Sequence, residues 1–275
     1  MNTDYSKVKG KKLILFSGGM DCYIINELET PDVLLYIDNH SNYSKNEIEH
    51  IRQLQASGKF PNLIIVDDFI NMSKTERDDY IIPCRNAYFA MIAAEYGDEI
   101  ILGATSGDRP TDKCRPFARM MTKLLNHLYE TPHLAGKNPD GTPYRNIKVN
   151  LKYKGYSKED LIRALVRKRK KQLEVSYKEA RKVVADELYD NSASCYNFTN
   201  NKPCGVCKSC LRKWLAILGA TGIDTGYRYD THPRDYFTPE TIEEWIKKET
   251  GPGNRGKESR ETVRVLERLR SEYNI

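Results

Sequence analysis

A glycine turn is the feature that most constrains how this chain can fold. It follows an apolar run at residues 12–16 and precedes a run at 23–28 that suits a helix. Such a turn leaves backbone N–H groups unpaired at the positive end of a helix, and glycines let an anion approach them closely. We therefore expect a phosphate-binding turn, with an ordinary strand-to-helix connection as the alternative. The turn consists of Ser17, Gly18, Gly19, Met20, Asp21 and Cys22.

Composition limits the class of protein. In the 275 residues, 39% are hydrophobic and 30% are charged, which is typical of a globular protein. No apolar run approaches the roughly 20 residues of a membrane span, and the first residues lack a signal-peptide pattern, so we expect a cytoplasmic location. The net charge of +6 gives only a weak preference for anionic partners such as nucleotides or RNA.

The first half of the chain alternates strand-like and helix-like segments. The strand-like runs are apolar throughout, as in strands that are covered on both faces. This order predicts an α/β fold, with a parallel sheet and helices on both faces. We expect a nucleotide-binding core at 1–150, a helical and zinc-binding region packed on the core at 151–235, and a C-terminal helical extension at 236–275. The expected strands are 12–16, 33–37, 63–66, 100–103 and 147–151, and the expected helices of this half are near 22–29, 44–57, 85–96 and 115–129.

Polar residues follow several of these strands. Ligands of parallel sheets bind beyond the carboxyl ends of the strands, so these positions are candidates for a site. His40 follows the second strand, and a long polar loop after the fourth strand carries Asp108 and Asp112. Arg85 and Asn86 start a helix after Pro83, where a solvated arginine and a capping asparagine are an equally simple interpretation.

Four of the seven cysteines lie close together in the sequence. In a chain without a secretion signal, such clustering indicates metal ligation rather than disulfides. Four thiolates fill a tetrahedral zinc site and leave no open position, so we expect a structural metal. Iron–sulfur clusters use similar spacings and remain an alternative. The cysteines are Cys195, Cys204, Cys207 and Cys210.

The second half of the chain is mostly helical. Ser157 and Asp160 form a capping box that starts a helix, and the basic run 167–171 ends it. Cations suit the end of a helix, although contact with RNA or phosphate is an alternative. A breaker segment at 251–256 precedes a charged helix in the tail, which we expect to dock on the main body or on another subunit.

Taken in this order, the motifs resemble those of the 7-cyano-7-deazaguanine synthases. These are PP-loop ATP pyrophosphatases with an adenine-nucleotide α-hydrolase-like fold. The glycine turn resembles their SGGxDS signature, residues 83–86 their P-x-R-N segment, residues 112–116 their D-C-R-x loop, and the four cysteines their zinc motif. The resemblance spans residues 12 to about 218. The chain departs from the family at Cys22, where a serine is usual, and at residues 38–43, and its tail beyond about 235 is extra.

The resemblance implies a reaction and its participants. ATP would adenylate the carboxylate of 7-carboxy-7-deazaguanine with loss of pyrophosphate, and ammonia would convert the product to the nitrile. ATP with magnesium would bind at Phe16 and the glycine turn, while Asp108 and His40 would contact the acceptor. We also expect structural zinc and a homodimer. The catalytic candidates are Asp21, Arg85, Asn86, Asp112 and Arg115.

Three other functions stay open. A related enzyme could conjugate the activated deazaguanine to an amine of a protein or nucleic acid. A tRNA-thiolating PP-loop enzyme would need a reactive cysteine pair, for which Cys84 and Cys114 are the candidates. In a non-enzymatic zinc-ribbon binding module, the glycine turn would be incidental.

Overall fold

The computed structural model describes residues 5–42, 44–78, 81–108, 111–131, 135–193, 195, 198–199 and 202–272. The chain divides into two compact units. The first consists of residues 1–17, 29–104 and 109–154, and the second of residues 18–28, 105–108 and 155–275.

The first unit contains a five-stranded sheet in which every pairing is parallel. The strand order is β3-β2-β1-β4-β5, so the chain builds outward from β1 and then returns to its other side. The α/β fold class predicted from the sequence is confirmed, and the strands coincide with the expected runs to within two residues at either end. The strands are β1 (Lys12–Leu15), β2 (Val33–Ile37), β3 (Leu63–Val66), β4 (Glu99–Ile101) and β5 (Lys148–Asn150).

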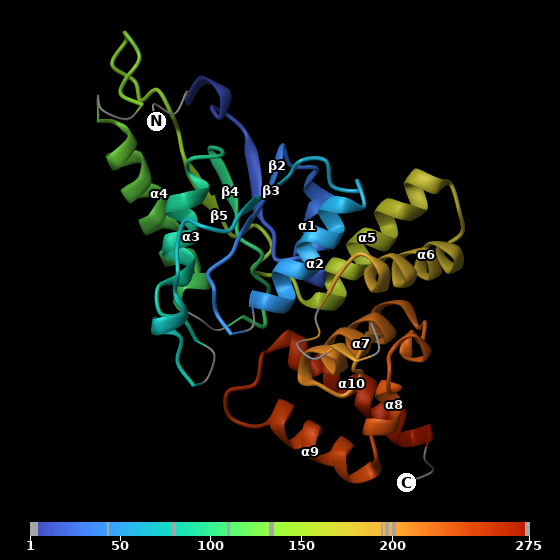
Figure 1. Cartoon of the computed structure of the whole chain (residues 1–275). Helices are drawn as coiled ribbons and strands as arrows, with labels where there is room; N and C mark the ends of the chain where they lie inside the picture. The colour runs from blue at the N-terminus through green and yellow to red at the C-terminus, as the bar shows by residue number, and fades with distance from the viewer. Residues whose placement is uncertain are drawn as a thin grey trace. The chain divides into compact units, whose positions relative to one another are not determined.

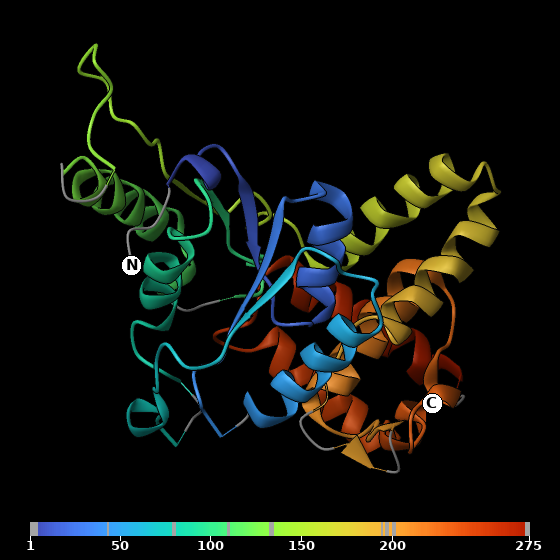
Figure 2. The same cartoon turned by 45° about the horizontal axis from the view of Figure 1, so that its top comes forward.

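Helices flank this sheet. Helices α3 (Arg85–Ala93) and α4 (Arg115–Tyr129) lie along one side of it, and α2 (Ser44–Ala56) lies along the other (Figures 1 and 2). The buried core between the sheet and α3 and α4 combines strand residues such as Leu35 and Ile100 with helix residues such as Ala90, Met121 and Leu125. Apolar residues cover both faces of the central strands, which explains why these strands carry no polar alternation.

The second unit is mainly helical. Helices α5 and α6 each begin with a complete capping box, Ser157 with Asp160 and Ser176 with Glu179, and they pack against each other (Figure 1). The core of the remainder surrounds Trp214 and Phe237, whose rings stack 6.0 Å apart. Its helices are α1 (Met20–Glu29, all but the last residue), α5 (Lys158–Leu173), α6 (Tyr177–Asp190), α7 (Lys208–Thr221), α8 (Pro233–Tyr236), α9 (Pro239–Thr250) and α10 (Lys257–Glu272).

Two features of the second unit differ from the sequence-based expectation. Helix α5 continues two residues beyond the basic run that was expected to end it. Arg169, in that run, is held by Glu27 and by Glu187, so this cation serves the fold. Helix α9 lies in the extension at 236–275 that was expected to be helical, but it was not predicted as an individual helix, although Thr238 caps it and a proline occupies its first position.

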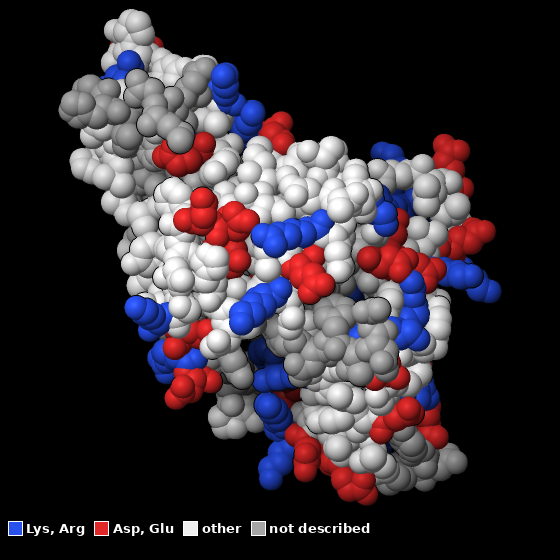
Figure 3. Space-filling model, viewed as in Figure 1, with Lys and Arg blue, Asp and Glu red and all other residues white. Residues whose placement is uncertain are grey.

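Charged side chains of both signs are interspersed on the face that Figure 3 shows, rather than separated into a basic and an acidic area. In the part of the chain that the structure describes, no helix is both long and apolar enough to cross a membrane.

Candidate functional site

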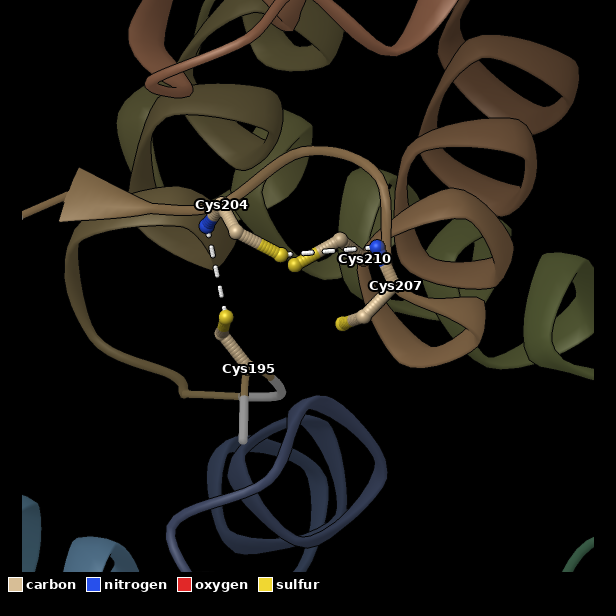
Figure 4. A group of neighbouring side chains, drawn as sticks. All are labelled: Cys195, Cys204, Cys207 and Cys210. Atoms are coloured by element: carbon tan, nitrogen blue, oxygen red, sulfur yellow. Dashed lines mark hydrogen bonds between the residues drawn. The ribbon is translucent and has the colours of Figure 1, made fainter. Parts of the chain in front are cut away.

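The four cysteines come together in the second unit. Their sulfur atoms all lie within 4.8 Å of one another, and Figure 4 shows the side chains converging. Zinc–thiolate bonds of about 2.3 Å in a tetrahedron place sulfurs about 3.8 Å apart, so these residues fit such an ion. The cluster can therefore hold a metal through four protein ligands, Cys195, Cys204, Cys207 and Cys210.

Local structure explains this convergence. The short hairpin of β6 (Phe198–Thr199) and β7 (Lys202–Pro203) carries the chain to Cys204, and Cys207 occupies the N-cap of α7. Gly205 has a φ of 81°, and a Cβ there would lie 1.8 Å from the carbonyl oxygen of Thr231. Only glycine fits at this bend.

Backbone donors and a buried cation surround the sulfurs. The amide of Cys204 donates to Sγ of Cys195 at 3.3 Å, and the amide of Cys207 donates to Sγ of Cys204 at 3.4 Å. Burial lowers the pKa of Lys213 to about 7, whereas the Cys210 sulfur opposes that change. Four thiolates on a divalent metal carry a net charge of −2, which a nearby ammonium helps to offset.

The glycine turn has the geometry of a strand-to-helix connection. Gly18 has a φ of 69°, which favours glycine, and α1 begins two residues later. The carbonyl oxygen of Gly18 accepts a hydrogen bond from the amide of Ala193 at 2.9 Å. Phe16 and Ser17 belong to the first unit, whereas the rest of the turn, through Cys22, belongs to the second.

Asp21 pairs with a residue that the sequence reasoning missed. Lys158, the first residue of α5, forms an ion pair with Oδ2 of Asp21 in the first turn of α1. Oδ1 of Asp21 is buried and has no hydrogen-bond partner among the described residues. Asp108 and Glu258 also act on the ammonium of Lys158, and its pKa is raised despite the opposing effect of burial. The capping box located Lys158 at a helix start, but no local pattern indicated Asp21 as its partner.

Asp108 supports its own loop. Its Oδ2 accepts from the amide of Thr105 at 2.7 Å and from the hydroxyl of Thr105 at 3.3 Å. The next residue of the loop, Ser106, donates its amide to the carbonyl oxygen of Tyr156 at 2.8 Å. These bonds fix a short polar segment, residues 105–108, to the start of α5.

The remaining catalytic candidates belong to the first unit. Oδ2 of Asp112 accepts from the amide of Asn86 at 3.3 Å and so satisfies a free N–H in the first turn of α3. The residue before α3, Cys84, has a φ of 58°. Arg85 begins α3, and its guanidinium lies 5.9 Å from the ring centre of Phe89. Arg115 begins α4.

A polar group also forms after β2. His40, with a φ of 55°, donates its amide to Oδ1 of Asp38 at 2.8 Å. Glu47 in the first turn of α2 was not predicted as a site residue. Burial raises its pKa to about 7, with Arg85 opposing and Asp38 reinforcing the change. A carboxyl group held in this way, near a cation, is a candidate functional group.

Comparison with known proteins identifies one protein family that matches most of this chain. The family model for the queuosine biosynthesis protein QueC matches residues 32–218. The matched segment contains the four cysteines, Glu47, Arg85 and Lys158, and it begins after the glycine turn. No curated protein matches the chain.

Proposed function

This chain belongs to the QueC family of queuosine biosynthesis proteins, and on that premise we propose that it uses ATP to activate the carboxylate of 7-carboxy-7-deazaguanine. Ammonia then converts the acyl adenylate to an amide, and a second activation with dehydration gives 7-cyano-7-deazaguanine. The protein is thus an ATP-dependent carbon–nitrogen ligase. The cytoplasmic location and the homodimer stay predictions.

The pairing of Asp21 with Lys158 is the observation that supports ATP chemistry best. When the substrate carboxylate attacks the α-phosphorus, the bond to pyrophosphate breaks and negative charge builds on the leaving group. The backbone N–H groups at the start of α1, where the helix dipole is positive, are donors for that charge. Lys158 supplies a cation beside these donors, and such a fixed charge lowers the barrier most where water is excluded.

Magnesium is the expected companion of ATP. Oxygen ligands suit this ion, and the second carboxylate oxygen of Asp21 is a buried acceptor without a protein partner among the described residues. When bound, magnesium would neutralise charge on the phosphates. Asp21 would hold it, while Lys158 balances the remaining charge.

Zinc is the metal that suits the four cysteines. The sulfur spacing fits tetrahedral zinc, and four protein ligands leave no position for a reacting water. Its role is therefore to hold the β6–β7 hairpin on the start of α7.

Arg85 and Glu47 are the first unit's strongest candidates for contact with the substrate. Arg85 offers a cation for phosphate or carboxylate oxygens, and Glu47 offers a carboxyl group for the N–H donors of a guanine-like base. Asn86 and Asp112 position the start of α3, and Arg115 provides a second cation at the start of α4.

A mass-spectrometric assay tests the proposal. The protein is incubated with ATP, magnesium, 7-carboxy-7-deazaguanine and ammonia, and the products are AMP, pyrophosphate and the nitrile if the proposal is correct. A reaction without ammonia should accumulate the adenylate. Release of AMP without nitrile, with the deazaguanine attached to an added protein or nucleic acid, would favour the conjugating enzyme instead. Failure to bind or cleave ATP would leave a zinc-containing binding module.

The conjugating enzyme is retained as the second candidate because residues 38–43 differ from the family's usual segment and the tail is extra. In this chain the carboxylate of Asp38 holds the backbone of His40, and Ser41 donates its amide to Oδ1 of Asn39 at 3.0 Å. A thiolating enzyme would need Cys84 and Cys114, and unchanged activity after both are replaced by alanine would exclude it.

A further inference from the structure

Glu258 lies in the first turn of α10, beyond the segment that the family model matches. It is 5% exposed, and a Cβ built on Gly107 would lie 2.3 Å from its Oε2. Its Oε1 accepts from Arg255, while Oε2 is buried without a hydrogen-bond partner in the part of the chain that the structure describes. A carboxylate from the C-terminal tail therefore rests directly on the backbone of the 105–108 loop.

The groups that face Glu258 come from five segments of the second unit: α1, the 105–108 loop, α5, α7 and the tail itself. Burial raises the pKa of Glu258; Lys158 and Arg255 oppose this change, whereas Asp21 and Asp108 reinforce it. Arg212 of α7 and Glu261 of α10 line the same small cavity as Glu258. Lys158 is consequently attracted by three carboxylates, of which Asp21 forms the ion pair.

Ion pairs fasten this part of the tail to the start of α5. Arg264 bonds both carboxylate oxygens of Glu159 at 2.6 and 2.8 Å, and Lys257 bonds Asp160 at 2.5 Å. On the other side, Arg255 pairs with Glu249 at 3.0 Å. Ion pairs thus hold Arg255 and Lys257, which lie before Glu258 and next to it. The tail also binds the two residues that follow Lys158.

We propose that Glu258 is a positioning residue for the phosphate-binding turn, acting on Lys158 through charge and on Gly107 through contact. This inference rests on the proposed function, because it gives the ammonium of Lys158 a task at the pyrophosphate. Glu258 and Asp108 attract the ammonium as Asp21 does, so three carboxylates rather than Asp21 alone fix its position. Without Glu258, one of the carboxylates that fix the ammonium is lost, and Lys158 is held less firmly in the place where it meets the phosphates.

Calorimetric titration of the full chain with magnesium–ATP tests this role. E258A is expected to weaken the affinity by about tenfold, as for the loss of one charged interaction. E258Q keeps the size of the side chain and removes its charge, and it should weaken the affinity by at least about threefold. E267A changes an exposed glutamate of the same helix and serves as the control, with the wild-type affinity expected.

The contact with Gly107 provides a second test. G107A puts a methyl group where the carboxylate of Glu258 lies, so it should also weaken binding by about tenfold. In G107A/E258A the methyl group has room, and the double variant should bind no more weakly than E258A. Such non-additivity is expected only of residues in contact. Melting temperature and metal content are measured for each variant, and titrations are made well below the melting temperature.

The outcomes separate this inference from the proposed function. If the wild type does not bind magnesium–ATP, the proposed function fails. If the wild type binds but E258A or E258Q binds equally well or more tightly, the positioning role of Glu258 is overturned. Additive losses in G107A and E258A would overturn the contact between the tail and the loop.

Discussion

Lys158 and Asp21 form an ion pair across 137 residues of sequence, each from the first turn of a helix. An aspartate at a helix N-terminus is favourable because the helix dipole is positive there, whereas a lysine is not. Lys158 occupies the first position of α5 nonetheless, and carboxylates from three other segments surround it. A lysine at this unfavourable position is better explained by a negatively charged group that its ammonium binds than by the stability of the helix.

Lys158→Met should weaken binding of magnesium–ATP by about 10- to 100-fold, since a charged interaction with a phosphate contributes about 1.5–3 kcal/mol. Methionine keeps the length of the side chain and removes its charge. Lys171→Met, at an exposed position of the same helix, should bind ATP as the wild type does. Equal affinities of the two variants in a titration would remove Lys158 from the nucleotide site.

Cys207→Ser should yield protein that has lost its metal and is poorly folded. A structural zinc site contributes on the order of ten kcal/mol to folding, and a serine hydroxyl is a weak replacement for a thiolate. Cys84→Ser changes an exposed thiol outside the cluster and should keep both metal and stability. Metal content from mass spectrometry and melting temperatures provide the comparison. Bound zinc with wild-type stability in Cys207→Ser would contradict the structural role.

The fold was largely predictable because local patterns encode it. The uninterrupted apolar runs of β1 and β2 are the direct consequence of burial on both faces, and they appear in the sequence without any knowledge of partners. In β3 the same apolar character does not report burial, because Ile64 is exposed. The cysteine spacing similarly reports the short hairpin and helix start that bring the four sulfurs together. The capping box of Ser157 located the start of α5 correctly.

The charged contacts could not be predicted in this way. Whether a lysine or glutamate is solvated or buried depends on residues far away in the sequence, and no periodicity records that choice. The sequence patterns singled out neither Lys158 nor Glu258, and they indicated Arg169 only as part of a basic helix end. In the structure, Lys158 and Arg169 pair with carboxylates of other segments, and Glu258 is buried and pairs with Arg255.

Glu29→Gln should destabilise the protein in a pH-dependent way. Burial alone would raise the pKa of Glu29, but hydrogen bonds from Lys152, Tyr153 and Lys12 lower it to about 2, compared with an ordinary value of 4.5. A lowered pKa contributes stability above pH 4.5 that is lost as the pH falls toward 2. This change in the pKa of Glu29 corresponds to a contribution of about 3 kcal/mol, at most, to the free energy of unfolding.

The melting temperature of Glu29→Gln should therefore lie several degrees below that of the wild type at pH 7. The difference should shrink steadily between pH 4.5 and pH 2. Glu244→Gln, at an exposed position, is the matched control and should follow the wild type throughout. A difference that does not change with pH would show that the loss comes from altered packing rather than from the charge of Glu29.

Glu47→Gln should stabilise the protein at neutral and higher pH, in contrast to Glu29→Gln. Burial raises the pKa of Glu47 to about 7, so the folded protein binds a proton there that the unfolded chain, with a value near 4.5, releases. The contribution of Glu47 to the free energy of unfolding therefore falls as the pH rises from 4.5 to 7, and it stays low above pH 7. A neutral glutamine avoids that cost, and the gain at pH 8 is about 1–3 kcal/mol.

Thermal melts at pH 4 and pH 8 measure this effect. Glu47→Gln should match the wild type at pH 4 and melt several degrees higher at pH 8, whereas Glu49→Gln, an exposed neighbour on the same helix, should change neither value. A residue that lowers stability at neutral pH is expected to be kept for its chemistry, so the stabilised variant should lose affinity for 7-carboxy-7-deazaguanine. A variant that is less stable at pH 8 would instead show that ionised Glu47 supports the fold through Arg85.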